Sequence, residues 1–301
     1  MIPLNVLKQE KESIKDIGNI IDVLKTVSLV QFRQIQARKP STTEFNKELQ
    51  LTFNLLDKNE LNNNPLLNKS SPKAAGILVA TSDEGFLGDL NSSLLKKAIE
   101  YKREPNDQII VLGEKGKRYL KEKNECFLSF PGLKDDIKIS ETIGMRNYLI
   151  SEYKKRFNKI IFVYPKFISF TSYKIDHLQL LPFPLLKKET SNGNKYEVSN
   201  DPSPGRVLEG LVTLWITYML NEIFWSTKFT EYSVRAMYLE SSNQELLRLK
   251  EKSTMEYFKT LHALNDKTIR EVSVSKLIMG KKKKTRSQED EKARRWKNKV
   301  I

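Results

Sequence analysis

Few residues in the sequence could form a catalytic or binding site, and the most suggestive pattern is a pair of glycines before a predicted helix. Gly85-Phe86-Leu87-Gly88 follows an apolar run and precedes a helical pattern, so a phosphate could bind at that helix N-terminus. The three-glycine dinucleotide pattern is incomplete, however, and Asp89 would repel a phosphate. The segment Gly113-Glu114-Lys115-Gly116-Lys117 lacks the spacing and the terminal Ser or Thr of a phosphate loop. We therefore expect no cofactor.

Metal, disulfide and nucleophile chemistry is not predicted either. Cys126 is the only cysteine, which excludes an internal disulfide, and His177 and His262 are the only histidines. A zinc site needs three or four ligands at close spacing, and the sequence shows no such group. The acidic pair Asp135-Asp136 is expected on a solvated loop. We expect a chain with no catalytic site and no metal site of its own.

The charge balance is strongly basic, with a formal net charge of +15 over 301 residues. The tail from Lys281 to Ile301 holds ten Lys and Arg against three Asp and Glu. A basic balance indicates an acidic partner, which could be nucleic acid, anionic lipid or an acidic protein surface. No apolar run reaches the roughly 18 residues of a membrane span, and the start does not resemble a signal peptide. We expect a cytoplasmic protein.

The elements that would position any site begin with a long N-terminal helix, predicted from about Val6 to Lys39 and ended by Pro40. Its seam residues recur three and four positions apart, which is typical of a coiled coil: Ile14, Ile17, Ile21, Leu24, Ser28, Gln31 and Ile35. The stripe is widened by Ile20, Val23, Val27 and Val30. We therefore expect this helix to meet more than one partner.

The middle of the chain alternates strands with helices after a second helix, predicted over Thr42–Asp57. Strands are predicted at Ala75–Ala80, Gln108–Leu112, Lys159–Tyr164 and Tyr173–Leu181. Helices are predicted at Leu90–Lys102, Lys115–Lys123 and Thr142–Arg156. This alternation favours a mostly parallel sheet with helices on its faces. The polar stretch Leu186–Asp201 is expected to form a loop.

A second long helix follows, because Pro204 to Met279 contains no further proline and its glycines, Gly205 and Gly210, lie at the start. Its first part, Leu208–Trp225, is apolar all round and is expected to pack on the sheet. Its later stripe is half polar: Phe258, Leu261, Asn265, Thr268, Val272, Ser275 and Met279. Such a thin stripe needs a partner helix, and the N-terminal helix is the candidate.

The predicted fold class is α/β, with a long antiparallel coiled coil of the N- and C-terminal helices and an inserted Rossmann-like α/β domain. We divide the chain into residues 1–57 (N-terminal helices), 73–186 (α/β domain), 204–280 (C-terminal helix) and 281–301 (basic extension). Such an architecture suits a lever or an axle. An unrelated coiled-coil protein with a globular head remains open on these grounds alone.

One segment after the first predicted strand resembles a family signature. Thr81-Ser82-Asp83-Glu84-Gly85-Phe86-Leu87-Gly88-Asp89-Leu90-Asn91 is similar to T-S-D-R-G-L-C-G-G-L-N of the gamma subunits of F-type ATP synthases, with seven of eleven positions alike. Three further blocks resemble the family in order: Leu24–Ser28 with Phe32–Gln36, then Val163–Phe167 with Leu180–Pro182, and Glu231–Met237.

The resemblance implies the central rotor shaft of a rotary ATPase that catalyses nothing by itself. Its partners would be alpha and beta subunits, which form the ring that handles ATP, with an epsilon-type subunit and a ring or adaptor at the foot. No nucleic acid is expected. The complex would lie at the cytoplasmic face of the membrane, and its output would be proton transport or another mechanical work such as gliding.

The resemblance also implies which residues contact the ring. These are Leu24, Lys25, Arg33, Glu84, Asn265, Thr268, Ile269 and Val272. Two departures stand out: Glu84 replaces a basic residue of the family signature, and Thr268-Ile269 replaces an R-Q pair. Both departures change the charge at the corresponding predicted contact.

The tail is longer than in the family, whose chains usually end near the position of Gly280. Ser287-Gln288-Glu289-Asp290 is typical of a helix start, with basic residues following. We expect the tail to emerge from the ring and contact an acidic surface through Lys281, Lys282, Lys283, Lys284, Arg294 and Arg295. The alternative is a solvated, disordered tail.

Two other classes of function compete with a rotor. A basic coiled-coil protein that binds nucleic acid or acts as a scaffold would show DNA binding that weakens steeply with salt. A free-standing enzyme built on the α/β domain would show ATPase activity in the purified chain.

Overall fold

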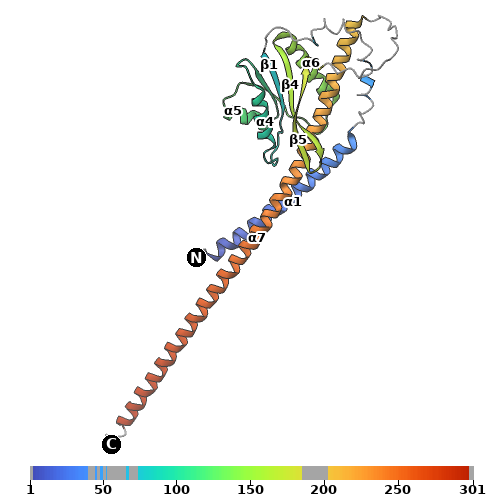
Figure 1. Cartoon of the computed structure of the whole chain (residues 1–301). Helices are drawn as coiled ribbons and strands as arrows, with labels where there is room; N and C mark the ends of the chain where they lie inside the picture. The colour runs from blue at the N-terminus through green and yellow to red at the C-terminus, as the bar shows by residue number, and fades with distance from the viewer. Residues whose placement is uncertain are drawn as a thin grey trace. The chain divides into compact units, whose positions relative to one another are not determined.

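The structure is a computed structural model that describes residues 3–39, 45, 48, 49, 52, 66, 67, 74–184 and 203–297 (Figure 1). From residue 282 onward it describes the backbone alone. The predicted helix Thr42–Asp57 lies mostly outside the described residues; Phe45, Glu48, Leu49 and Thr52 are described there and are helical. The predicted loop Leu186–Asp201 lies wholly outside them.

A five-stranded sheet forms the middle of the chain, in the order β3-β2-β1-β4-β5. The strands are β1 (Ala74–Ala80), β2 (Gln108–Leu112), β3 (Phe127–Phe130), β4 (Phe157–Ser169) and β5 (Ser172–Leu181). The first four strands pair in parallel, and β5 returns antiparallel to β4. The predicted mostly parallel sheet is therefore confirmed. The prediction missed β3, because four residues at a sheet edge give too short a pattern.

Helices cover both faces of this sheet, as Figure 1 shows. They are α4 (Leu90–Tyr101), α5 (Glu114–Glu122) and α6 (Ile139–Lys155), joined by the first part of the last helix, α7. On one face α4 and α5 pack on alternate strand residues such as Ile77 and Val111. On the other face α6 and α7 pack on Leu78, Ile110 and Phe162. Burying each such side chain stabilises the fold by about 1.5–3 kcal/mol.

The last helix, α7, runs from Pro204 to Lys297 over 94 residues. The sequence predicted an end near Gly280 and a fresh start at Ser287, and both predictions are wrong. A helical glycine costs only about 1 kcal/mol, and the lysines that follow are good helix formers. The helix therefore continues through Gly280 into the basic tail.

The apolar first part of α7 packs on the sheet as predicted, through a stripe that includes Leu208, Val212, Ile216 and Leu220. It is not buried all round, since Leu214 is exposed. By length and composition a window within Gly205–Met279 could cross a membrane, which a count of unbroken apolar residues overlooked. The buried stripe shows that this part of the helix serves a protein core.

The chain divides into two compact units. The coil unit holds residues 1–22 and 242–301, and the sheet unit holds residues 23–241. The long helices α1 (Leu4–Arg38) and α7 contribute to both units. This grouping differs from the four-part division drawn from the sequence, which stays a prediction.

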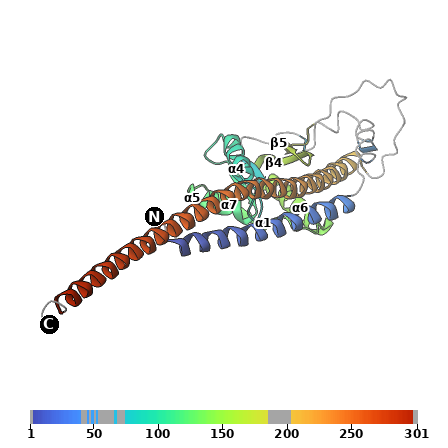
Figure 2. The same ribbon diagram turned by 90° about the horizontal axis from the view of Figure 1, so that it is seen from below.

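Helices α1 and α7 pair antiparallel in each unit (Figure 2). In the coil unit, Asp22 bonds to Asn243 at 3.0 Å, and Lys11 lies 5.6 Å from the ring centre of Tyr257. In the sheet unit the pairs are Lys25–Glu240 at 2.9 Å, Phe32–Phe229 at 5.6 Å between ring centres, and Lys39–Glu222 at 3.3 Å. Partner numbers rise on one helix as they fall on the other, so the predicted antiparallel pair is confirmed.

The seam of α1 differs from the predicted one at a single repeat. Ile14, Ser28 and Ile35 are buried as predicted, but Ile17 is 46 % exposed. Gly18 faces α7 in its place, where a Cβ would lie 3.2 Å from Leu246 Cδ2. A glycine allows the helices to approach closely, and a pattern built on apolar residues cannot detect it. The widening residues Ile20, Val23, Val27 and Val30 are exposed.

Candidate functional site: a charged junction on the long helix

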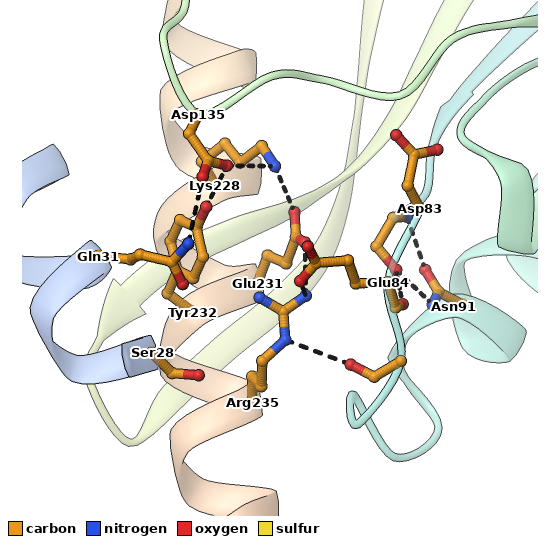
Figure 3. Close-up of polar contacts among 12 residues, drawn as sticks. Ser28, Gln31, Asp83, Glu84, Asn91, Asp135, Lys228, Glu231, Tyr232 and Arg235 are labelled. Atoms are coloured by element: carbon orange, nitrogen blue, oxygen red, sulfur yellow. Dashed lines mark hydrogen bonds and ion pairs between the residues drawn. The ribbon is translucent and has the colours of Figure 1, made fainter. Parts of the chain in front are cut away.

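Three charged side chains of α7 form the centre of the site. Lys228, Glu231 and Arg235 are spaced three and four residues apart, so they share one face of the helix. Lys228 bonds to Glu231 at 3.1 Å, and Glu231 bonds to Arg235 at 2.8 Å (Figure 3). All three side chains are at most 7 % exposed. Burial this deep requires each charge to be paired.

The loop before α6 joins this centre through Asp135. Lys228 Nζ lies 3.3 Å from Asp135 Oδ1, and the Tyr232 hydroxyl donates a hydrogen bond to the same oxygen. Gln31 of α1 donates to Asp135 Oδ2 at 3.2 Å. We call this set, with the three side chains above, the charged junction. The sequence placed Asp135 on a solvated loop without a role; although half exposed, it links two helices.

Electrostatics fixes the proton positions at this contact. Partial burial by itself would raise the pKa of Asp135, but the hydrogen bond from Tyr232 and the charge of Lys228 outweigh it and hold that pKa below its ordinary value. Burial, with the hydrogen bond to Asp135, raises the pKa of the Tyr232 hydroxyl far above its ordinary value. At neutral pH a protonated hydroxyl therefore donates to a carboxylate.

The signature segment after β1 joins the junction from the other side. Arg235 Nη2 lies 3.2 Å from Glu84 Oε2, and Arg235 Nε donates to the Gly85 carbonyl at 3.2 Å. Ser82 Oγ donates to the Glu84 carbonyl at 2.8 Å, and Asn91 Nδ2 donates to Ser82 Oγ at 2.9 Å. The charged junction thus fixes α7 to two loops and to α1. Each of its charged side chains is paired within the chain, so the junction holds these elements together.

The predicted ring contacts are divided between the sheet unit and the coil unit. Lys25 pairs with Glu240, next to the half-buried Leu24, and Arg33 is exposed on α1. Glu84 pairs with Arg235 of the charged junction. Exposed positions on the coil-unit part of α7 are occupied by Asn265, Thr268, Ile269 and Val272. In the tail, Lys281 is exposed, and Lys282, Lys283, Lys284, Arg294 and Arg295 lie in the helical stretch described by its backbone alone.

Sequence reasoning missed the roles of Lys228 and Tyr232 at the junction. The signal that could have revealed them is a set of charged residues, Lys228, Glu231 and Arg235, that recur three and four positions apart among apolar residues of a helix. Glu231, Tyr232 and Arg235 had been singled out only as part of a block that resembles the family. Among the described residues no group of three His, Cys, Asp or Glu is arranged to hold a metal ion.

The coil-unit part of α7 presents a different surface. From Leu264 to Met279 every side chain is exposed. Seven of these are large and apolar: Leu264, Ile269, Val272, Val274, Leu277, Ile278 and Met279. Apolar side chains concentrated on an exposed helix indicate a surface for another protein.

Comparison with known proteins identifies a family model and relatives that match most of the chain. The family model described as ATP synthase matches residues 3–264. The ATP synthase gamma chain of Mesoplasma florum is 27 % identical over 289 residues, covering 93 % of this chain and all of the relative. That of Trichlorobacter lovleyi is 26 % identical, covering 85 % and 92 %.

Solved structures share the fold. A chain of the Euglena gracilis mitochondrial ATP synthase (OSCP, F1 and c-ring, rotational state 3) superposes with a TM-score of 0.68 at 15 % identity, covering 92 % of this chain and 94 % of that one. A central stalk and c-ring structure of the Tetrahymena thermophila mitochondrial ATP synthase gives 0.56 at 14 % identity, covering 74 % and 99 %. Taken with the family model, these matches show that the chain belongs to the gamma-subunit family of F-type ATP synthases.

Proposed function

We propose that this chain is the central rotor shaft of an F-type rotary ATPase. The observation that carries the proposal is the exposed apolar stretch of α7 from Leu264 to Met279, which follows the antiparallel helix pair along the same helix. A ring of alpha and beta subunits would surround this stretch. An asymmetric shaft gives each site of the ring a different coupling to the same ligand, so hydrolysis or synthesis of ATP becomes rotation.

The chain itself is proposed to be non-catalytic, with ATP chemistry in the ring. We propose Asn265, Thr268, Ile269 and Val272 as ring contacts on α7, with Leu24, Lys25 and Arg33 on α1 and Glu84 in the signature segment. The exposed positions of most of these residues support the assignment, although Leu24 is half-buried and Lys25 and Glu84 are already paired within the chain. An epsilon-type subunit and a ring or adaptor would bind at the foot.

The basic tail is proposed to bind an acidic surface. The family model ends at residue 264, whereas α7 continues to Lys297, roughly 50 Å further at 1.5 Å per residue. Replacing six of the ten tail cations, Lys281–Lys284, Arg294 and Arg295, by Gln keeps the helix and lowers the net charge of residues 281–301 from +7 to +1. We expect normal ATPase activity with weakened, salt-sensitive attachment of the tail's partner. Unchanged attachment in this variant and in a deletion of residues 281–301 would refute the proposal.

The output is proposed to be proton transport at the cytoplasmic face of the membrane, with a gliding output as a second hypothesis. The relatives named above carry ATP synthase names, and they lend no support to gliding or to nucleic-acid binding. A proton ionophore distinguishes the two outputs. In a proton-coupled motor the proton gradient opposes ATP hydrolysis, so removing the gradient speeds hydrolysis, whereas a motor without proton coupling would not respond.

Affinity purification through a tag on this chain tests the proposed function. We expect alpha- and beta-type chains in threefold excess over the tagged chain, and ATPase activity that follows the ring. Recovery of the chain alone, or with DNA that leaves at high salt, would reject the rotor and favour the nucleic-acid alternative.

A further inference from the structure

The last part of α7 continues as one helix beyond its pairing with α1. Lys11, near the start of α1, lies over the ring of Tyr257, and from Leu264 to Met279 every side chain of α7 is exposed. The helix nevertheless runs unbroken to Lys297, well past the N-terminus of α1 (Figures 1 and 2). If a ring surrounds the exposed apolar stretch, the basic extension follows that ring along the same axis. Over residues 281–297 the helix spans about 24 Å at 1.5 Å per residue.

The cations of the basic extension are distributed around the whole circumference of this helix. Successive residues of an α-helix are turned by about 100°, so four consecutive positions go once round the axis. The four lysines Lys281–Lys284 fill one such turn. The helix then carries five further cations: Arg286, Lys292, Arg294, Arg295 and Lys297. Viewed along the axis, these nine positions leave no sector wider than about 80° without a cation.

This arrangement differs from that of a helix that docks through one face. A helix that lies in a groove carries its anchor residues three and four positions apart. Here four cations occupy consecutive positions, and so do the three acids, Glu289, Asp290 and Glu291. The sign of the charge therefore changes along the axis, from a basic turn through an acidic turn to a second basic segment, and neither sign is confined to one face.

A turning shaft presents every side of its helix to a fixed partner in each revolution. Cations on one face would make the attraction to a fixed acidic surface strongest at one angle, and the shaft would pause there. Cations on all sides keep that attraction nearly constant, so the end of the helix is held while it stays free to turn. Torque also requires that the ring itself be kept from turning, which calls for a stationary protein attached to it.

We propose that the basic extension is an electrostatic bearing, and that its partner is an acidic face of a stationary protein that lies beyond the ring. The inference rests on the proposed rotor function and deepens it, because it names the place and the chemistry of the tail's partner. A partner on one side of the axis needs a rotor that is charged all round, whereas a symmetric ring surrounds the shaft with its own repeated charges. The distribution of the cations thus favours a one-sided partner.

Two variants of equal charge test the bearing. Each replaces five of the nine helical cations by Gln and keeps three lysines and one arginine over nearly the same length of helix. The one-face variant keeps cations that fall within a sector of about 80°: Lys281, Lys284, Lys292 and Arg295. The all-round variant keeps cations that are spread round the axis: Lys282, Lys284, Lys292 and Arg294.

Rotation of the complete complex, with its stationary parts attached, is followed at low salt. We expect the one-face variant to make one extra pause per revolution, with about a tenfold longer residence at that angle than wild type, which corresponds to 1.4 kcal/mol or about two exposed ion pairs. The pause should vanish at high salt, and the all-round variant should lack it. No extra pause would overturn the bearing, and three per revolution would assign the contact to the ring instead; either result leaves the rotor intact.

Cross-linking identifies the partner. A photoreactive side chain in place of Lys283, in the complete complex, should attach to an acidic segment of a protein other than the alpha and beta chains. The same group in place of Ile269 is the control and should attach to the ring. Attachment of position 283 to the ring, to a basic segment or to nothing, while position 269 reaches the ring, would overturn this inference alone. Absence of the ring from the complex would instead reject the proposed function.

Discussion

The same two helices are held together in two different ways in the two units. In the sheet unit, α1 and α7 share packed aromatic rings and ion pairs, and the buried Lys228, Glu231 and Arg235 tie α7 to two loops. In the coil unit the seam is thin. Gly18 lies against Leu246, and the Ser253 hydroxyl is buried with no hydrogen-bond partner among the residues that the structure describes. Stability is thus concentrated in the sheet unit, and the coil unit keeps exposed apolar surface for other subunits.

The largest expected effect comes from breaking the charged junction. Arg235→Ala leaves Glu231 buried with one partner fewer and releases Glu84 and Gly85. Removing one member of a buried ion pair costs about 3–5 kcal/mol, so we expect a large drop in the free energy of unfolding, measured with urea. Arg248→Ala is the matched control, because the Arg248 pair with Glu245 is exposed. Equal losses in the two variants would contradict the comparison.

A smaller drop in the free energy of unfolding is expected from Tyr232→Phe, which removes only the hydrogen bond to Asp135. A hydrogen bond to a charged group contributes about 1.5–3 kcal/mol, and the exposed half of Asp135 places the expected loss at or below the lower end. Calorimetry of both chains measures it. A variant as stable as wild type would show that the junction does not depend on this contact.

The same contact predicts a pH dependence. Because the folded pKa of Asp135 lies below its ordinary value of 3.8, its stabilising contribution is present above that pH and is lost as pH falls through the folded pKa. Asp135→Asn should therefore be less stable than wild type at neutral pH, and the difference should shrink below about pH 4. A constant difference across an acid titration followed by circular dichroism would contradict this assignment.

In the coil unit we expect one substitution, Ser253→Ala, to raise the stability of the chain. Ser253→Ala removes a buried hydroxyl that has no partner among the described residues, and alanine is the better helix former. The free energy of unfolding of this unit should rise by about 1 kcal/mol, seen as slower amide exchange in α1 and α7. Faster exchange would show that the thin seam depends on this serine.

The smallest effect on the isolated chain is expected from Ile269→Asn, since Ile269 is 63 % exposed. Exposed substitutions change stability by at most about 0.5 kcal/mol. Assembly with the ring should nevertheless weaken, because the exposed stretch is proposed to bind there. Thermal unfolding measures the stability of the isolated chain, and the yield of the reconstituted complex measures its assembly with the ring. Normal assembly would move the ring contact away from this position.

Much of the fold could be predicted from the sequence, because buried parallel strands such as β1 and β2 are unbroken apolar runs. The antiparallel helix pair could also be predicted, since two long helices with incomplete apolar stripes need each other. Gly18 could not be placed in the seam, because close approach leaves no apolar signal. The charged junction depends on Asp135 and Arg235, which lie 100 residues apart, and only the tertiary fold brings their segments together.

The most direct test of the central claim is to watch the shaft turn. Cys126 is the only cysteine and is exposed, so it can carry a probe while the ring is fixed to a surface. On addition of ATP the account predicts stepwise rotation of the probe in one direction at a rate that follows hydrolysis. A stationary probe on a ring that hydrolyses ATP would contradict it.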